Sequence, residues 1–285
     1  MDDARVWSLP MGKDLIDVFR YDQGQLIHVM GQGDAPADTS TRYHILALWQ
    51  AAQAVADAAL MTVRSAAGVA LAMRNGGFIV TGGSSLNIGL LRAASKQFAP
   101  VQIAADPVWS LETEDPFQRV FWAIATRLDA AVLPRCFMFD IAGVRGEVAV
   151  DNGVLRFSGD FTSPEAFVAE LRAASKIDEE IRYTLAAAPA DTTLPAFSMT
   201  HLLAQVATPS QDGCFTFDPA GWPLAYPAGE TFASVRAMSA IAARFAACGG
   251  EDATLSVLSD ANLPLLKGTR GDDGIVTFTA KGRGA

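Results

Sequence analysis

The sequence contains little of the chemistry that catalytic and metal-binding sites most often use. It has three cysteines and three histidines among 285 residues. The cysteines are far apart, and each lies in an apolar run: Cys136, Cys214 and Cys248. Because an odd number of widely spaced cysteines is a poor disulfide framework, we expect reduced core thiols in a cytoplasmic protein.

Long apolar runs and basic clusters are absent as well. No run of about 18 apolar residues is present, so no transmembrane helix is expected. Met1, Asp2 and Asp3 begin the chain and no apolar segment follows directly, so no signal peptide is expected. The formal net charge is −9 and the pI is about 4.8. Phosphate neutralisation needs clustered lysine and arginine, so nucleic-acid and anionic-membrane partners are disfavoured.

Apolar residues are abundant, at 50% of the chain, and charged residues make up 19%. This composition is typical of a globular protein with substantial cores. A length of 285 residues allows two or three small domains.

The region from residue 15 to residue 98 has the clearest secondary-structure pattern. Two apolar stretches within residues 15–30 predict a β-hairpin. Hydroxyl caps at residues 39–41 and an apolar stripe with 3–4 spacing then predict a long helix over residues 41–60. Three short strands follow, with a tight turn at Asn75 and Gly76, and a closing helix is expected over residues 86–98.

The end of this region reads Phe-Ile-Val-Thr-Gly-Gly-Ser-Ser-Leu-Asn-Ile-Gly-Leu-Leu-Arg-Ala-Ala from Phe78 to Ala94. It resembles the second half of bacterial roadblock/LC7 domains, in which the last strand leads into a helix of the Asn-x-Gly-Leu-x-Arg type. The places of that motif are occupied by Asn87, Gly89, Leu90, Leu91 and Arg92. The family's usual first helix has no counterpart, because residues 4–12 contain a proline and a glycine.

A similar order of elements is predicted near the C-terminus. A short helix over residues 197–206 comes first. Two strands then flank an Asp-x-x-Gly turn at residues 218–221, which is similar to the opening of a roadblock domain. A helix over residues 231–248 and three further strands complete the region, and no closing helix is expected.

The middle region, residues 100–190, is predicted to be a smaller α+β segment. Asp115 and Pro116 begin a helix, and three strands follow between residues 136 and 158. A second helix begins near Pro164, and one more strand is expected at residues 181–185. The segment is either a degenerate copy of the flanking units or an unrelated α+β piece.

The sequence therefore predicts an α/β chain, in α+β layers, with repeated antiparallel five-stranded sheets and helices of roadblock or profilin-like type. The two similar units are residues 14–99 and 196–281. Family members commonly dimerise through long helices and continuous sheets, so the resemblance implies an intramolecular pseudo-dimer or a homodimer. Small residues that permit close helix contact are the expected interface: Ala47, Ala51, Ala54, Ala58, Ala233, Ala237, Ala240 and Ala247.

Residues that could carry chemistry also have structural explanations. His28, His44 and His201 do not pair at metal-ligand spacing, so structural or surface roles are expected. Residues 82–85, Gly-Gly-Ser-Ser, are either an anion site or a capped strand-to-helix turn, and they match no phosphate-loop motif.

Three further groups of residues each leave two interpretations open. Carboxylates at predicted strand ends are either acid–base or metal groups, or ordinary turn residues: Asp140, Asp151 and Asp160. Arginines of the first unit are either an arginine finger for a GTPase or a solvated face: Arg42, Arg64, Arg74 and Arg92. Tryptophans are either interface anchors or core residues: Trp49, Trp109, Trp122 and Trp222. The sequence assigns no catalytic, cofactor-binding or metal-binding residue.

The resemblance implies a non-enzymatic scaffold or regulatory protein that acts through protein–protein contacts, with a Ras-like small GTPase as one candidate partner. The alternative is a small-molecule sensor module, because profilin-like and PAS-like sheets share this order of elements. A closed pocket between sheet and helix would favour the sensor, and a flat apolar surface would favour the scaffold.

Overall fold

The structure is a computed structural model of the chain. It describes residues 15–22, 25–31, 39–55, 58–65, 68–73, 78–82, 111, 113–176, 181–186, 191–248, 250, 252–259, 261 and 263–280. The chain divides into two compact units. Unit 1 comprises Met1–Pro107 together with Arg244–Ala285, and unit 2 comprises Val108–Ala243.

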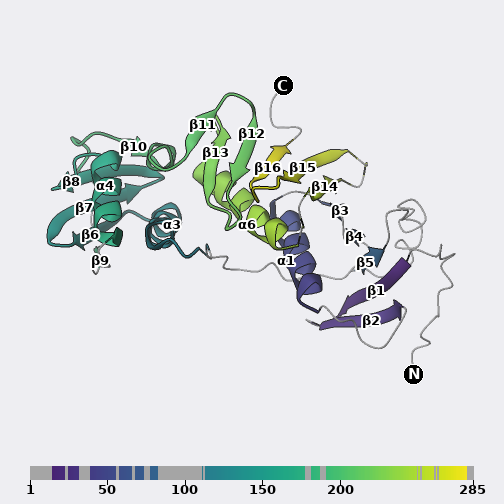
Figure 1. Ribbon diagram of the computed structural model, residues 1–285. Coiled ribbons are helices and arrows are strands. Elements are labelled where there is room, and N and C mark those ends of the chain that lie inside the picture. Colours follow the sequence, from purple (N-terminus) through teal and green to yellow (C-terminus); the bar gives the residue numbers. More distant parts are fainter. Residues whose placement is uncertain are drawn as a thin grey trace. The chain divides into compact units, whose positions relative to one another are not determined.

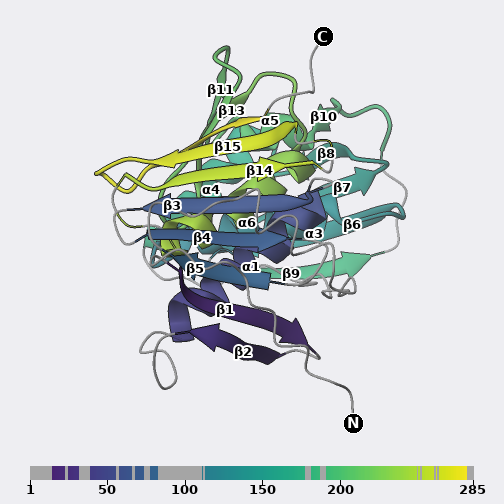
Figure 2. The same ribbon diagram turned by 90° about the vertical axis from the view of Figure 1, so that its right-hand side faces the viewer.

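Unit 1 contains a large antiparallel sheet with strands from both ends of the chain. From the N-terminal region come β1 (Leu15–Asp22), β2 (Gln25–Gly31), β3 (Leu60–Ser65), β4 (Gly68–Met73) and β5 (Phe78–Gly82). From the C-terminal region come β14 (Thr254–Leu258), β15 (Pro264–Arg270) and β16 (Val276–Ala280). Within this unit the strand order is β16-β15-β14-β3-β4-β5-β1-β2, and Figure 2 shows the strands from β15 to β2 in this order.

Helix α1 (Thr39–Val55) packs against β4 and β5 of this sheet. The predicted apolar stripe is its buried face, since Ile45, Leu48 and Trp49 are all buried. Amphipathic spacing placed these side chains on one side of the helix, and burying them against the sheet stabilises the unit by the hydrophobic effect.

Unit 2 contains a five-stranded sheet in the order β10-β8-β7-β6-β9 (Figure 1). Its main strands are β6 (Arg135–Ile141), β7 (Val144–Asp151), β8 (Val154–Gly159) and β9 (Ile181–Ala186), with the short β10 (Phe197–Ser198) at one edge. Helix α4 (Pro164–Lys176) lies on this sheet, and helix α3 (Pro116–Asp129) packs on α4. The ring of Phe167, from α4, meets Phe139, Phe157 and Phe161, so an aromatic core joins helix and sheet.

Unit 2 also contains a second hairpin and most of a long helix. β12 (Cys214–Phe217) and β13 (Pro223–Pro227) pair antiparallel, and β11 (Thr208–Ser210) pairs parallel to β13. Helix α6 (Phe232–Cys248) begins in unit 2 and ends in unit 1. The prediction of a mixed α/β chain with antiparallel sheets is confirmed. Strand β11 was not predicted.

The predicted end of the first long helix was wrong. α1 ends at Val55, residues 58–59 are not helical, and Leu60 is the first residue of β3. The amide of Ala59 donates to the carbonyl of Leu258 at 2.8 Å, and Leu60 pairs with both Met73 and Leu258. Pairing between distant strands therefore overrides the high helix propensity of the local alanines.

The helix predicted over residues 197–206 was too long. α5 spans only Met199–Leu203, because Phe197 and Ser198 form β10 and pair with Leu155 and Val154 of β8. The His201 ring also stabilises the start of α5, since its Nδ1 accepts a hydrogen bond from the amide of Ser198 at 3.1 Å.

Several predictions fall outside the described residues. They include the closing helix at 86–98 with Asn87, Gly89, Leu90, Leu91 and Arg92, residues 83–85 of the Gly-Gly-Ser-Ser segment, Arg74 and Trp109. Among the helices that the structure describes, none is long and apolar enough to cross a membrane.

Candidate functional site

The pairing of β3 with β14 is the central feature of unit 1. The two strands are antiparallel, with Leu60 opposite Leu258, Thr62 opposite Ser256 and Arg64 opposite Thr254. Each strand directly follows a long helix in the chain, and Thr62 and Ser256 are each the third residue of their strand. Equivalent residues of the two strands therefore lie opposite each other at the centre of the pairing. A local two-fold axis between two similar segments would produce this register.

The two strands of this junction differ in burial. In β3, Leu60, Met61, Thr62 and Val63 are all at most 6% exposed, so both faces of the strand are covered. In β14, Leu255 and Val257 are buried, whereas Ser256 and Leu258 are half-buried. Beyond β14, strands β15 and β16 are polar on that second face, where Lys267, Thr269 and Thr279 are exposed. The two similar strands therefore differ in their surroundings on this face of the sheet, which is covered at β3 and partly exposed at β14.

The alanines expected at an interface are distributed over different environments. Ala58 is fully buried, although it lies after the helix and not on it. The half-buried ones are Ala47, Ala51, Ala237 and Ala240, and the exposed ones are Ala54, Ala233 and Ala247. Their role as an interface stays a prediction.

A different pair of small residues on α6 makes a close backbone contact in unit 2. Gly221, at the end of the β12–β13 turn, faces Ser239 and Ala243, and a Cβ added at Gly221 would lie 2.6 Å from the Ser239 carbonyl oxygen. The Ser239 hydroxyl donates to the Gly221 carbonyl. Sequence analysis missed this contact, and the available signal was the glycine at the fourth position of the Asp-x-x-Gly turn.

Asp218 builds that turn. Its Oδ1 accepts from the amides of Ala220 at 2.9 Å and Trp222 at 2.8 Å, and its own amide donates to the Trp222 carbonyl at 3.0 Å. Such a side-chain-to-backbone network is typical of aspartate in turns. It fixes Trp222 and Gly221 in the orientations in which they meet α3 and α6.

Trp222 joins two parts of unit 2 through an aromatic cluster. Its ring lies 5.6 Å from that of Phe121 and 6.0 Å from that of Trp122, measured between centroids. Trp122 in turn lies 5.5 Å from Phe232 at the start of α6. The core interpretation is confirmed for Trp49 and Trp122, and Trp222, at 5% exposed, is also a core residue and not a free interface anchor.

An ion pair links α3 to α6 beside this cluster. Arg236 Nη2 lies 3.7 Å from Asp129 Oδ2, and the Asp129 side chain is 20% exposed. Burial raises the pKa of Asp129 above its ordinary value, and the nearby Arg236 guanidinium offsets only part of this increase. The folded protein therefore holds a proton at Asp129 more readily than the unfolded chain does.

The Asp129→Asn variant is expected to be slightly more stable than the wild type at pH 7, by less than about 1 kcal/mol. Because the folded-state pKa of Asp129 is raised, its protonated form adds to the free energy of unfolding. This stabilisation is fully present below the unfolded-state pKa, about 3.9, and it is lost as the pH rises through the folded-state pKa. Urea unfolding between pH 4 and pH 7 should show a downward trend in the wild type that is weaker in the variant. A less stable variant at pH 7 would mean that the ion pair outweighs the burial of the charge.

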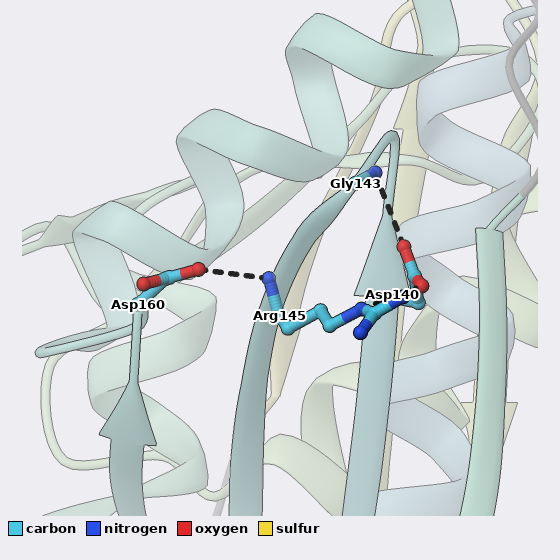
Figure 3. Close-up of polar contacts among 4 residues, drawn as sticks. All are labelled: Asp140, Gly143, Arg145 and Asp160. Carbon is cyan, nitrogen blue, oxygen red and sulfur yellow. Dashed lines mark hydrogen bonds and ion pairs between the residues drawn. The ribbon is translucent and has the colours of Figure 1, made fainter.

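The three carboxylates of the middle region do not form one site. Asp140 Oδ2 lies 3.1 Å from Arg145 Nε, and its Oδ1 accepts from the Gly143 amide at 3.1 Å. Asp160 Oδ2 accepts from the Arg145 amide at 3.0 Å, so both carboxylates hold the same hairpin (Figure 3). Asp151 lies at the other end of β7, opposite Val154. Turn and strand-end roles account for these residues.

The remaining candidates are not brought together. His44 and Arg64 are exposed, His201 caps α5, and the structure describes only the backbone of His28 and Arg42. In the part of the chain that the structure describes, no group of three or more His, Cys, Asp or Glu side chains is placed to hold a metal ion.

The three cysteines are free thiols, and the thiols of Cys136 and Cys248 have raised pKa values. Burial, followed by the charge of Glu147, raises the pKa of the Cys136 thiol to about 11, and Cys136 Sγ donates to Glu147 Oε2 at 3.6 Å. Burial raises the pKa of the Cys248 thiol to about 12. At neutral pH both are therefore almost entirely protonated and poor nucleophiles.

Thiol titration of the folded protein at pH 8 should show one fast-reacting cysteine and two slow ones. Because their raised pKa values leave Cys136 and Cys248 with very little thiolate at pH 8, both should react at least about 100-fold more slowly in the folded protein than in denaturant, and Cys214 should account for the fast phase. The Cys214→Ser variant should lose the fast phase, and both slow thiols should become fast in denaturant. A fast phase that persists in this variant would contradict the assignment.

Comparison of the chain with protein-family models, curated proteins and solved structures gives no match.

Proposed function

We propose that this chain is a non-enzymatic scaffold or regulatory protein that acts through protein–protein contacts, organised as an intramolecular pseudo-dimer of two roadblock-like segments. The observation that carries the proposal is the antiparallel β3–β14 junction centred on Thr62 and Ser256. It makes the sheets of the N-terminal and C-terminal segments continuous within one chain, as expected if the two segments pair like the subunits of a roadblock dimer.

The order of elements in the two segments supports the pairing. Each segment has a hairpin, β1–β2 or β12–β13, then a long helix, and then a three-stranded meander. The helices α1 and α6 both contain 17 residues. On either side of the junction the meanders run in mirror order, β16-β15-β14 and β3-β4-β5.

The environments of the chemically reactive residues support a non-enzymatic role. Asp140 and Asp160 are occupied in holding the β6–β7 hairpin, and Asp218 holds the turn before β13. The thiols of Cys136 and Cys248 have raised pKa values and are poor nucleophiles. These groups serve the architecture of the chain.

The resemblance to roadblock/LC7 domains makes a Ras-like small GTPase the first partner to test. Roadblock proteins that act on GTPases often position their partner, and the continuous sheet of unit 1 with α1 packed on it offers a surface for that task. A small-molecule sensor of profilin-like or PAS-like architecture is the alternative outcome of the same experiment.

The test is affinity capture with the tagged full chain from a lysate of its own host, in parallel with added GDP and with a non-hydrolysable GTP analogue. Nucleotide-dependent enrichment of a small GTPase, identified by mass spectrometry, is the expected result. The purified pair should then be assayed for binding, and for the rates of nucleotide exchange and hydrolysis by the GTPase.

Three other results are informative. Enrichment of proteins other than GTPases, regardless of nucleotide, would support a scaffold without GTPase control. Hydrolysis of nucleotide by the chain alone would overturn the non-enzymatic assignment. No protein enriched above a tag-only control would contradict the scaffold and favour the sensor, which a thermal-shift screen against small metabolites would then test directly.

A further inference from the structure

We draw no further inference here: the strongest candidate, the edge strand β9 of the five-stranded sheet with its exposed Leu185, pairs with β6 on one side, and nothing in the part of the chain that the structure describes shows what covers its other side.

Discussion

Replacing Gly221 by alanine is expected to lower the free energy of unfolding of unit 2 by about 3 kcal/mol or more. Two penalties add at this position. Gly221 has a φ of +88°, a conformation that L-residues with a Cβ adopt only at a cost. The new Cβ would also lie 2.6 Å from the Ser239 carbonyl oxygen and 3.0 Å from the Ala243 Cβ, so the turn would have to move away from α6.

Gly229 provides a matched control for the Gly221→Ala variant. Its φ is +91°, but a Cβ added there would have no atom within 4 Å. The Gly229→Ala variant should therefore suffer only the conformational penalty, about 1 kcal/mol. Both variants can be compared by urea unfolding followed through tryptophan fluorescence, since Trp222 is adjacent to Gly221.

The Ser239→Ala variant separates the close contact from the hydrogen bond. It removes the hydroxyl that donates to the Gly221 carbonyl and leaves the backbone approach intact. A loss of about 1 kcal/mol is expected for one hydrogen bond. Equal losses in the Gly221→Ala and Gly229→Ala variants would show that the turn is not pressed against α6.

The order of elements could be predicted where local signals define it. Turn residues divide the strands of the five-stranded sheet, and the structure places Ala142 and Gly143 at φ values of 52° and 86°, and Asn152 and Gly153 at 49° and 77°. These are the positive φ values of tight hairpins, which glycine and asparagine accept readily. Asp115, followed by Pro116, likewise begins α3, with Asp115 Oδ1 accepting from the Phe117 amide at 2.8 Å.

Errors arose where distant partners decide local structure. The segment before Leu60 is rich in alanine and was predicted to be helical up to Leu60, but α1 ends at Val55 and Leu60 begins β3, which pairs with β4 and β14. Phe197 and Ser198 were predicted to begin a helix, but they pair with the edge of β8 and form strand β10. In each case one partner strand, β14 for β3 and β8 for β10, is remote in sequence, and local propensity does not report its ladder hydrogen bonds.

In the candidate site too, the contacts depend on tertiary structure that local sequence does not report. The pattern of α6 identifies its small residues, but it does not say which of them meets a backbone from elsewhere. Ser239 and Ala243 have that role because Gly221 lies against them, whereas Ala233 and Ala247 are exposed. The β3–β14 register could not be derived either, because antiparallel pairing between segments of one chain depends on tertiary placement.

A disulfide between Thr62→Cys and Ser256→Cys is expected to form within one chain. The two residues lie directly opposite each other in β3 and β14, where Cα atoms are about 4.5–5.5 Å apart and within disulfide range. Oxidation of the double variant, in a Cys214→Ser background, should give a product with the mobility of a single chain on a non-reducing gel. The cross-link closes a loop of roughly 200 residues and should stabilise unit 1 by up to about 5 kcal/mol.

The Thr62→Cys, Val257→Cys pair is the control, because Val257 lies opposite Met61 and so faces the other side of the sheet from Thr62. It should not cross-link under the same conditions. A covalent dimer of the Thr62→Cys, Ser256→Cys variant would mean that β3 of one chain pairs with β14 of another, so the pseudo-dimer would be a swapped homodimer. Failure of both pairs to cross-link would reject the β3–β14 register, and with it the continuous sheet on which the proposed function rests.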